Sequence, residues 1–80
     1  MKIPRDVSGR NLANVLCRKW SYIEVAQSGS HIILQTETPS HQRLPVPAHN
    51  ALKIGTISAI VRLVANHKGV SRQAVLESLD

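Results

Sequence analysis

The sequence predicts an α+β domain with the order helix, three strands, helix, followed by a short C-terminal helix. A helical apolar stripe near the N-terminus, three β-rich runs separated by short turns, and a second helical stripe in the last third indicate this order. The strands are expected to form a three-stranded antiparallel sheet with helices on one face, because such sheets bury one face and leave the other open. Residues 1–80 are expected to form a single domain, since 80 residues leave no room for a second core.

The first helix is predicted from about Gly9 to Trp20. Ser8 can act as its N-cap, and Val7 just outside can pack against the first turn. At about 100° per residue the helix has an apolar stripe and, opposite to it, a polar row. The stripe contains Leu12, Val15, Leu16 and Trp20, and the row contains Arg10, Asn14 and Arg18. Such a row is either an ordinary solvated face or a surface that follows phosphates.

Three strands are predicted next, at about Tyr22 to Gln27, His31 to Glu37 and Gln42 to Val46. The turns between them are Ser28-Gly29-Ser30 and Thr38-Pro39-Ser40, which have the residues that hairpin connections prefer.

The alternation of the second strand separates its two faces. Ile32, Leu34 and Thr36 share one face, and His31 lies on the other. Arg43 of the third strand is expected on the same open face as His31.

The C-terminal third is predicted to be helical. Pro45 and Pro47 indicate an edge strand leaving the sheet, since each proline lacks a ladder donor. Gly55-Thr56 is interpreted as a loop glycine and an N-cap, which begins the second main helix at about Ile57 and ends it near Asn66. A last helix is predicted at about Arg72 to Leu79, with Gly69 ending the turn before it and Ser71 as its N-cap.

The charge balance favours a polyanionic partner. Ten Lys and Arg against five Asp and Glu give a formal charge of +5 and a pI of about 10.2. The single cysteine, Cys17, excludes an internal disulfide, and no signal peptide or membrane-spanning run is visible. We therefore expect a soluble cytoplasmic protein with no membrane association and no small-molecule cofactor.

Several short motifs occur in order along the chain. They are Lys2-Ile3-Pro4 with Val7-Ser8-Gly9, then Gly29-Ser30-His31, then Val46-Pro47-Ala48-His49, then Gly55-Thr56-Ile57 with Ile60. In this order and spacing the chain, over about residues 2 to 79, resembles the HicA (YcfA-like) toxins, small mRNA interferases that are encoded beside a HicB antitoxin.

The resemblance implies a fold like that of double-stranded-RNA-binding domains (dsRBD-like). It also implies the toxin of a type II toxin–antitoxin system, with mRNA and a HicB-type antitoxin as partners, and it places the catalytic histidine of the Gly-Ser-His motif at His31. Two positions depart from the family pattern. Ser21 stands where glycine is common, and Ala26 where arginine is common, so we expect one RNA contact to be missing.

A histidine is suited to RNA cleavage without a metal. RNA carries its own nucleophile, the 2′-hydroxyl, and an imidazole can take or give a proton near neutral pH. His31 is therefore the predicted general base or acid, with His41 and His49 as candidates for a second group. Lys53 or Arg43 could stabilise the charge on the phosphorane.

No metal site is predicted, because the acidic and histidine residues show no ligand spacing. Trp20 and Tyr22 are too few for recognition by base stacking, so RNA contacts should be mainly to phosphates. The predicted RNA-binding residues are Lys2, Arg5, Arg10, Arg18, Lys19, Gly29, Ser30, Arg43 and Lys53.

Two other functions fit the same sequence. In one, the chain is a non-catalytic basic RNA-binding module of dsRBD-like fold, and His31 only makes a hydrogen bond in the hairpin. In the other, it is an interaction partner whose positive charge matches an acidic protein. RNA turnover would separate the first from a nuclease, and a neighbouring antitoxin gene would argue against the second.

Overall fold

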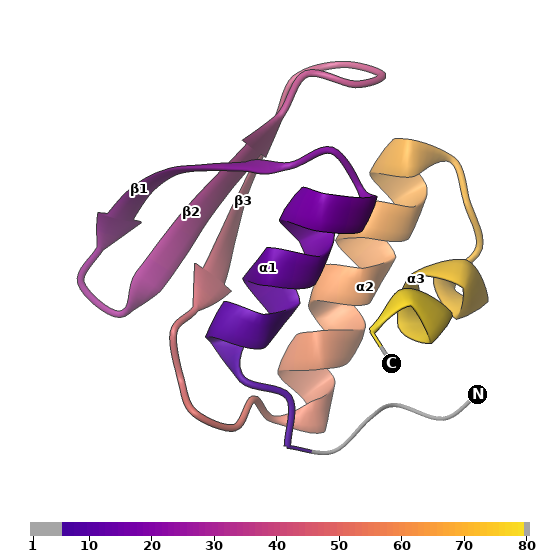
Figure 1. Ribbon diagram of the computed structural model, residues 1–80. Coiled ribbons are helices and arrows are strands. Elements are labelled where there is room, and N and C mark those ends of the chain that lie inside the picture. The colour runs from indigo at the N-terminus through magenta and orange to yellow at the C-terminus, as the bar shows by residue number, and fades with distance from the viewer. Residues whose placement is uncertain (1–5, 80) are drawn as a thin grey trace.

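The computed structural model describes residues 6–79, which form three helices and one three-stranded antiparallel sheet. The elements are α1 (Gly9–Lys19), β1 (Ile23–Ser28), β2 (His31–Thr36), β3 (Gln42–Pro47), α2 (Ile54–Lys68) and α3 (Arg72–Ser78). The predicted α+β class and the predicted order of elements are confirmed. Figure 1 shows α1 and α2 side by side on one face of the sheet, with both helices beginning at the same end of the molecule.

The sheet has the order β1-β2-β3, so both outer strands are edges. Leu34 pairs with Leu44 in β3, and Gln35 pairs with Ile23 in β1 and with Arg43 in β3. A register shift between Glu24 and Ala26 marks a bulge in β1. The prolines of β3 lie in an edge strand, where a missing N–H is tolerated, and for this reason the strand continues one residue beyond the predicted end.

The two faces of the sheet differ as the alternation predicts. In β2, Ile32, Leu34 and Thr36 are buried, while His31 is exposed. Opposite residues of antiparallel strands lie on the same face, so the open face carries Ile23, Gln35 and Arg43 in one row and Ser28, His31 and Pro47 in another. His31 and Arg43 therefore share the open face, as predicted, although they lie in different rows.

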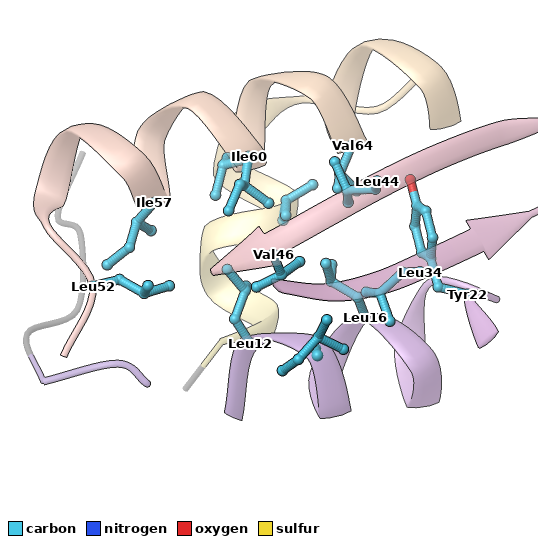
Figure 2. Close-up of a cluster of buried hydrophobic side chains, with 14 of the residues drawn as sticks. Leu12, Leu16, Tyr22, Leu34, Leu44, Val46, Leu52, Ile57, Ile60 and Val64 are labelled. Atoms are coloured by element: carbon cyan, nitrogen blue, oxygen red, sulfur yellow. The ribbon is translucent and has the colours of Figure 1, made fainter. Parts of the chain in front are cut away.

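The core lies between the sheet and the two long helices. Figure 2 shows Leu12 and Leu16 of α1 pointing toward Ile57, Ile60 and Val64 of α2, beside the buried side chains of the strands. With the aromatic residues limited to Trp20 and Tyr22, these aliphatic side chains fill the space between the layers.

The helix ends follow local capping signals with one exception. Ser8 and Ser71 are N-caps whose side chains accept hydrogen bonds from Asn11 N and Ala74 N, and Gly69 ends α2 with a φ of 70°. The predicted start of α2 at Ile57 is wrong, because the helix begins at Ile54 and includes Gly55-Thr56 in its first turn. The first-turn amides need no intrahelical partner, so a glycine there does little to prevent helix formation.

Candidate active site at one end of the sheet

His31 lies at the first position of β2, directly after a two-residue turn. Gly29 begins this turn with a φ of 57°, a conformation that glycine adopts without strain, and the pair Ser28–His31 closes the hairpin. The backbone of His31 is therefore fixed by pairing on both sides, to Ser28 of β1 and Pro47 of β3. Its side chain is exposed on the open face of the sheet.

The exit of β3 is joined to this turn. Ala48 N donates a hydrogen bond to Ser30 O at 2.6 Å, which continues the antiparallel pairing one step beyond the His31–Pro47 pair. His49 is the next residue and lies beyond the end of β3 at Pro47. The Pro-Ala-His segment is thus adjacent to the Gly-Ser-His segment, although 18 residues separate the two histidines in the sequence.

The N-terminus of α1 closes the same end of the molecule. Gly9 N donates to His49 O at 2.9 Å, and a Cβ at Gly9 would lie 1.8 Å from Pro47 O. Only glycine allows this approach of the helix to β3. Leu52 N donates to Val7 O at 2.8 Å, which also ties the start of α2 to this region.

The cations of α1 are distributed over the helix. Arg10 donates to Glu24 Oε1 of β1 at 2.6 Å, and this contact holds the pKa of the Glu24 carboxyl below its ordinary value. Lys19 donates to Ser78 O at 2.9 Å at the other end of the helix, and Arg18 lines an open groove between α1 and α3. The row Arg10, Asn14 and Arg18 is exposed, as expected, but its first member is paired with the sheet.

The other predicted RNA-binding residues that the structure describes lie at different distances from His31. Arg43 lies opposite Gln35, four positions along β3 from Pro47, which corresponds to about 13 Å at the rise of a β-strand. Lys53, at the end of the molecule where His31 lies, is therefore nearer to His31 along the fold than Arg43 is, and it is the better placed of the two predicted cations. Lys53 is the N-cap of α2 at the end where His31 lies, while Gly29 and Ser30 form the turn itself. Lys2 and Arg5 lie outside the described residues.

The remaining histidines are separated from this site by the length of the sheet or by α2. His41 contacts Glu37 at 3.0 Å beyond the far ends of β2 and β3, and this contact lowers the pKa of Glu37. His67 donates from Nε2 to Ser40 O at 2.8 Å. Of the two candidates for a second acid or base, the structure brings His49 to the turn and leaves His41 at the opposite end.

The two aromatic residues have structural roles. Tyr22 is buried and donates its hydroxyl proton to Gln42 Oε1, and burial raises the pKa of this phenol to about 12. Trp20 Nε1 donates to Ser78 Oγ at 2.8 Å, which holds α3 against the end of α1. Tyr22 is thus engaged within the core and Trp20 in the contact between helices.

Sequence reasoning did not identify a polar cluster on the covered side of the sheet. Thr36 Oγ1 donates to Ser21 O at 2.8 Å and accepts from Lys68 Nζ at 2.8 Å, and Lys68 also donates to Thr38 O at 2.6 Å. Burial lowers the pKa of Lys68. Since the ammonium is occupied by these acceptors and by the Tyr22 ring at 4.8 Å, we assign this cluster to stability.

Within residues 6–79, no group of three or more His, Cys, Asp or Glu side chains is placed to hold a metal ion. No helix in that range is long and apolar enough to cross a membrane. Comparison of the chain with protein-family models, curated proteins and solved structures finds no match.

Proposed function

We propose that the chain is a metal-independent endoribonuclease, an mRNA interferase of the HicA type and the toxin of a type II toxin–antitoxin system. His31 is the catalytic histidine and moves a proton during attack of the RNA 2′-hydroxyl on the adjacent phosphate. Cleavage then produces a 2′,3′-cyclic phosphate and a 5′-hydroxyl.

The observation that carries this proposal is the convergence of the motifs. Val7-Ser8-Gly9, Gly29-Ser30-His31 and Pro47-Ala48-His49 are joined by the hydrogen bonds from Gly9 N to His49 O and from Ala48 N to Ser30 O. These backbone hydrogen bonds bring the segments that carry the motifs to the end of the sheet where His31 is exposed. Their meeting supports a common site.

The arrangement of elements also supports a dsRBD-like fold. Two helices that begin at the same end cover one face of a three-stranded antiparallel sheet, in the order helix, three strands, helix. We propose that α3 is an addition to that fold, held by Trp20 and Lys19 through Ser78.

The open face offers a surface for the proposed HicB-type antitoxin. Ile23 is 60% exposed on this face, and half-buried Ile33 lies beside it. A partner that covers these side chains would bury apolar area and block access to His31. The formal charge of +5 favours an acidic partner.

Cleavage of RNA by the purified protein in the presence of a chelator tests the proposal. We expect shortened RNA with 2′,3′-cyclic phosphate ends, and a loss of about 10²- to 10⁴-fold in rate for His31→Ala, as general acid–base catalysis requires. Melting temperature is measured on the same samples. A well-folded His31→Ala protein with a near-normal rate would contradict the assignment of His31.

The same experiment separates nuclease from binding module. A non-catalytic module would bind RNA and leave its length unchanged, both before and after the substitution. In cells, induced expression should arrest growth and deplete mRNA, coexpression of the neighbouring gene should reverse the arrest, and His31→Ala should not cause it.

A further inference from the structure

Cleavage through the 2′-hydroxyl requires two proton transfers. One proton leaves the attacking 2′ oxygen, and another must reach the departing 5′ oxygen on the opposite side of the phosphorus. A single imidazole beside the 2′-hydroxyl does not reach both oxygens in one step, because a catalytic group must lie within about 3 Å of the atom it serves. If His31 serves one oxygen, a second group should lie across the phosphate from it.

His49 has the position that this role requires. The hydrogen bond from Ala48 N to Ser30 O holds the residue before His49 against the residue before His31. The main chains of the two histidines therefore lie on either side of this one contact, and each imidazole extends outward from its own strand end. A phosphodiester placed between the two rings lies within reach of both.

The backbone of His49 is fixed while its ring remains accessible. Its carbonyl accepts from Gly9 N at 2.9 Å, and Gly9 itself contacts Pro47 too closely for any other residue. The side chain of His49 is exposed, as is that of His31.

The four histidines divide into two pairs by their hydrogen bonds. The rings of His41 and His67 are bonded to Glu37 and to Ser40 O. In the part of the chain that the structure describes, no side chain or carbonyl makes a hydrogen bond to the ring of His31 or His49. The two histidines without a ring hydrogen bond are the two whose main chains are joined at this end of the sheet, through the contact of Ala48 N with Ser30 O.

We propose that His49 is the second catalytic group of this site and acts as the general acid, an inference that rests on the proposed ribonuclease function. His31 accepts the proton of the 2′-hydroxyl as the 2′ oxygen bonds to phosphorus. The bond from phosphorus to the 5′ oxygen breaks, and that oxygen takes a proton from the His49 imidazolium. The products are the cyclic phosphate and the free 5′-hydroxyl, and exchange with water restores both histidines.

A sulfur-substituted RNA tests this role directly. Once the main cleavage site is mapped on an mRNA, an oligonucleotide is made with sulfur in place of the 5′ oxygen at that position. A thiolate leaves without being protonated, so the general acid is no longer needed. We expect His49→Ala to cut the normal RNA about 10²- to 10⁴-fold more slowly and to cut the sulfur-substituted RNA within a few-fold of the wild-type rate.

Three further variants complete the comparison. His31→Ala should remain slow on both RNAs, because its base is still required, and His41→Ala should match the wild type on both. His49→Gln, which keeps a polar side chain but cannot act as a cationic acid, should show the same rescue as His49→Ala and replaces it if that protein does not fold.

Two results would overturn the inference while leaving the ribonuclease function intact. One is near-normal cleavage of normal RNA by folded His49→Ala and His49→Gln. The other is an equal loss on both RNAs, which would assign His49 to positioning. Failure of the wild type to cut either RNA would overturn the proposed function, and the inference with it.

Discussion

Gly9 shows how one residue can determine the geometry of the site. The helix N-terminus carries no unusual backbone angle there, yet a Cβ would lie 1.8 Å from a backbone oxygen of β3. The close contact lets Gly9 N reach His49 O, so the absence of a side chain positions the segment that contains His49.

Gly9→Ala should therefore destabilise the protein although alanine favours helices. We expect a loss of about 1–3 kcal/mol in the free energy of unfolding, as for other overpacked sites, measured by urea denaturation. Gly55→Ala is the matched control, since Gly55 lies in the first turn of α2 with no neighbouring atom within 4 Å of an added Cβ. It should be neutral or slightly stabilising. Equal effects of the two substitutions would contradict the proposed contact.

Ser21 has a left-handed backbone with a φ of 63°, at a position where the resembled family commonly has glycine. A residue with a Cβ costs about 1–2 kcal/mol in this conformation, and replacement by glycine removes that cost. Part of the gain is lost again, because glycine has a larger conformational entropy in the unfolded chain. Ser21→Gly should raise the free energy of unfolding by about 0.5 kcal/mol, which is roughly 2–4 °C in melting temperature for a domain of this size.

The reverse change at Gly69 is the control for this prediction. Gly69 has a φ of 70° and open space around an added Cβ, so Gly69→Ser introduces the same strain without a clash. The melting temperature should fall for this variant. A decrease for Ser21→Gly would show that the Ser21 side chain stabilises the turn.

At the scale of elements, α1 is joined to the sheet edge by one ion pair. Arg10 and Glu24 are 2.6 Å apart, and the guanidinium stabilises the charged carboxylate. Because the pKa of Glu24 is lowered in the folded protein, the contribution to stability is present above the ordinary carboxyl range and is lost as the pH falls through it.

Arg10→Ala should raise the pKa of Glu24 toward 4.5, as measured by carboxyl ¹³C shifts during a pH titration. Arg18→Ala, eight residues later in the same helix, should leave it unchanged. A Glu24 pKa that does not respond to Arg10→Ala would indicate that the pair does not form in solution.

The packing of β1 and β3 under α2 determines the ionisation of Tyr22. Burial raises the pKa of this single tyrosine from 10.0 to about 12, so the folded state keeps the phenol neutral. The stabilisation is complete below pH 10 and decreases as the pH rises toward 12, because the unfolded chain ionises first. Burial lowers the pKa of Lys68 from its ordinary value of 10.5, so the contribution of Lys68 to stability increases with pH until that value is reached. This is the opposite direction to the contribution of Tyr22.

Absorbance at alkaline pH should therefore show the tyrosine titrating at about 12 in the folded protein. Phenylalanine has no ionisable group, so in Tyr22→Phe the free energy of unfolding should no longer decrease between pH 10 and 12 because of this residue. The variant should be less stable than the wild type at neutral pH, since it loses the hydrogen bond to Gln42. A midpoint near 10 would contradict the burial of the hydroxyl.

For the whole molecule, the charge of +5 should dominate RNA affinity. In a His31→Ala background, in which the proposed cleavage should be slow, log K for single-stranded RNA should fall by about 0.7 per neutralised phosphate for each tenfold rise in salt. Lys53→Ala should reduce this slope by about 0.7, while Arg72→Ala in α3 should not change it. Affinity independent of salt would contradict recognition through phosphates.

The sequence by itself determined what depends on neighbours in the chain. The N-caps at Ser8 and Ser71 and the alternation of β2 were predictable because each involves residues within a few positions of one another. The end of α2 was predicted near Asn66, but the helix continues to Lys68 and Gly69 is its C-cap. The exposure of His31 on the open face followed from the same alternation.

Only the tertiary structure decided which of the candidate site residues meet. Gly9 and His49 are 40 residues apart in the sequence, and no local pattern predicts that their main chains are hydrogen-bonded. The same long-range packing pairs Arg10 with Glu24 and leaves Arg43 in a different row from His31. These positions result from the way that the helices and strands pack against one another, and chain neighbours do not determine that packing.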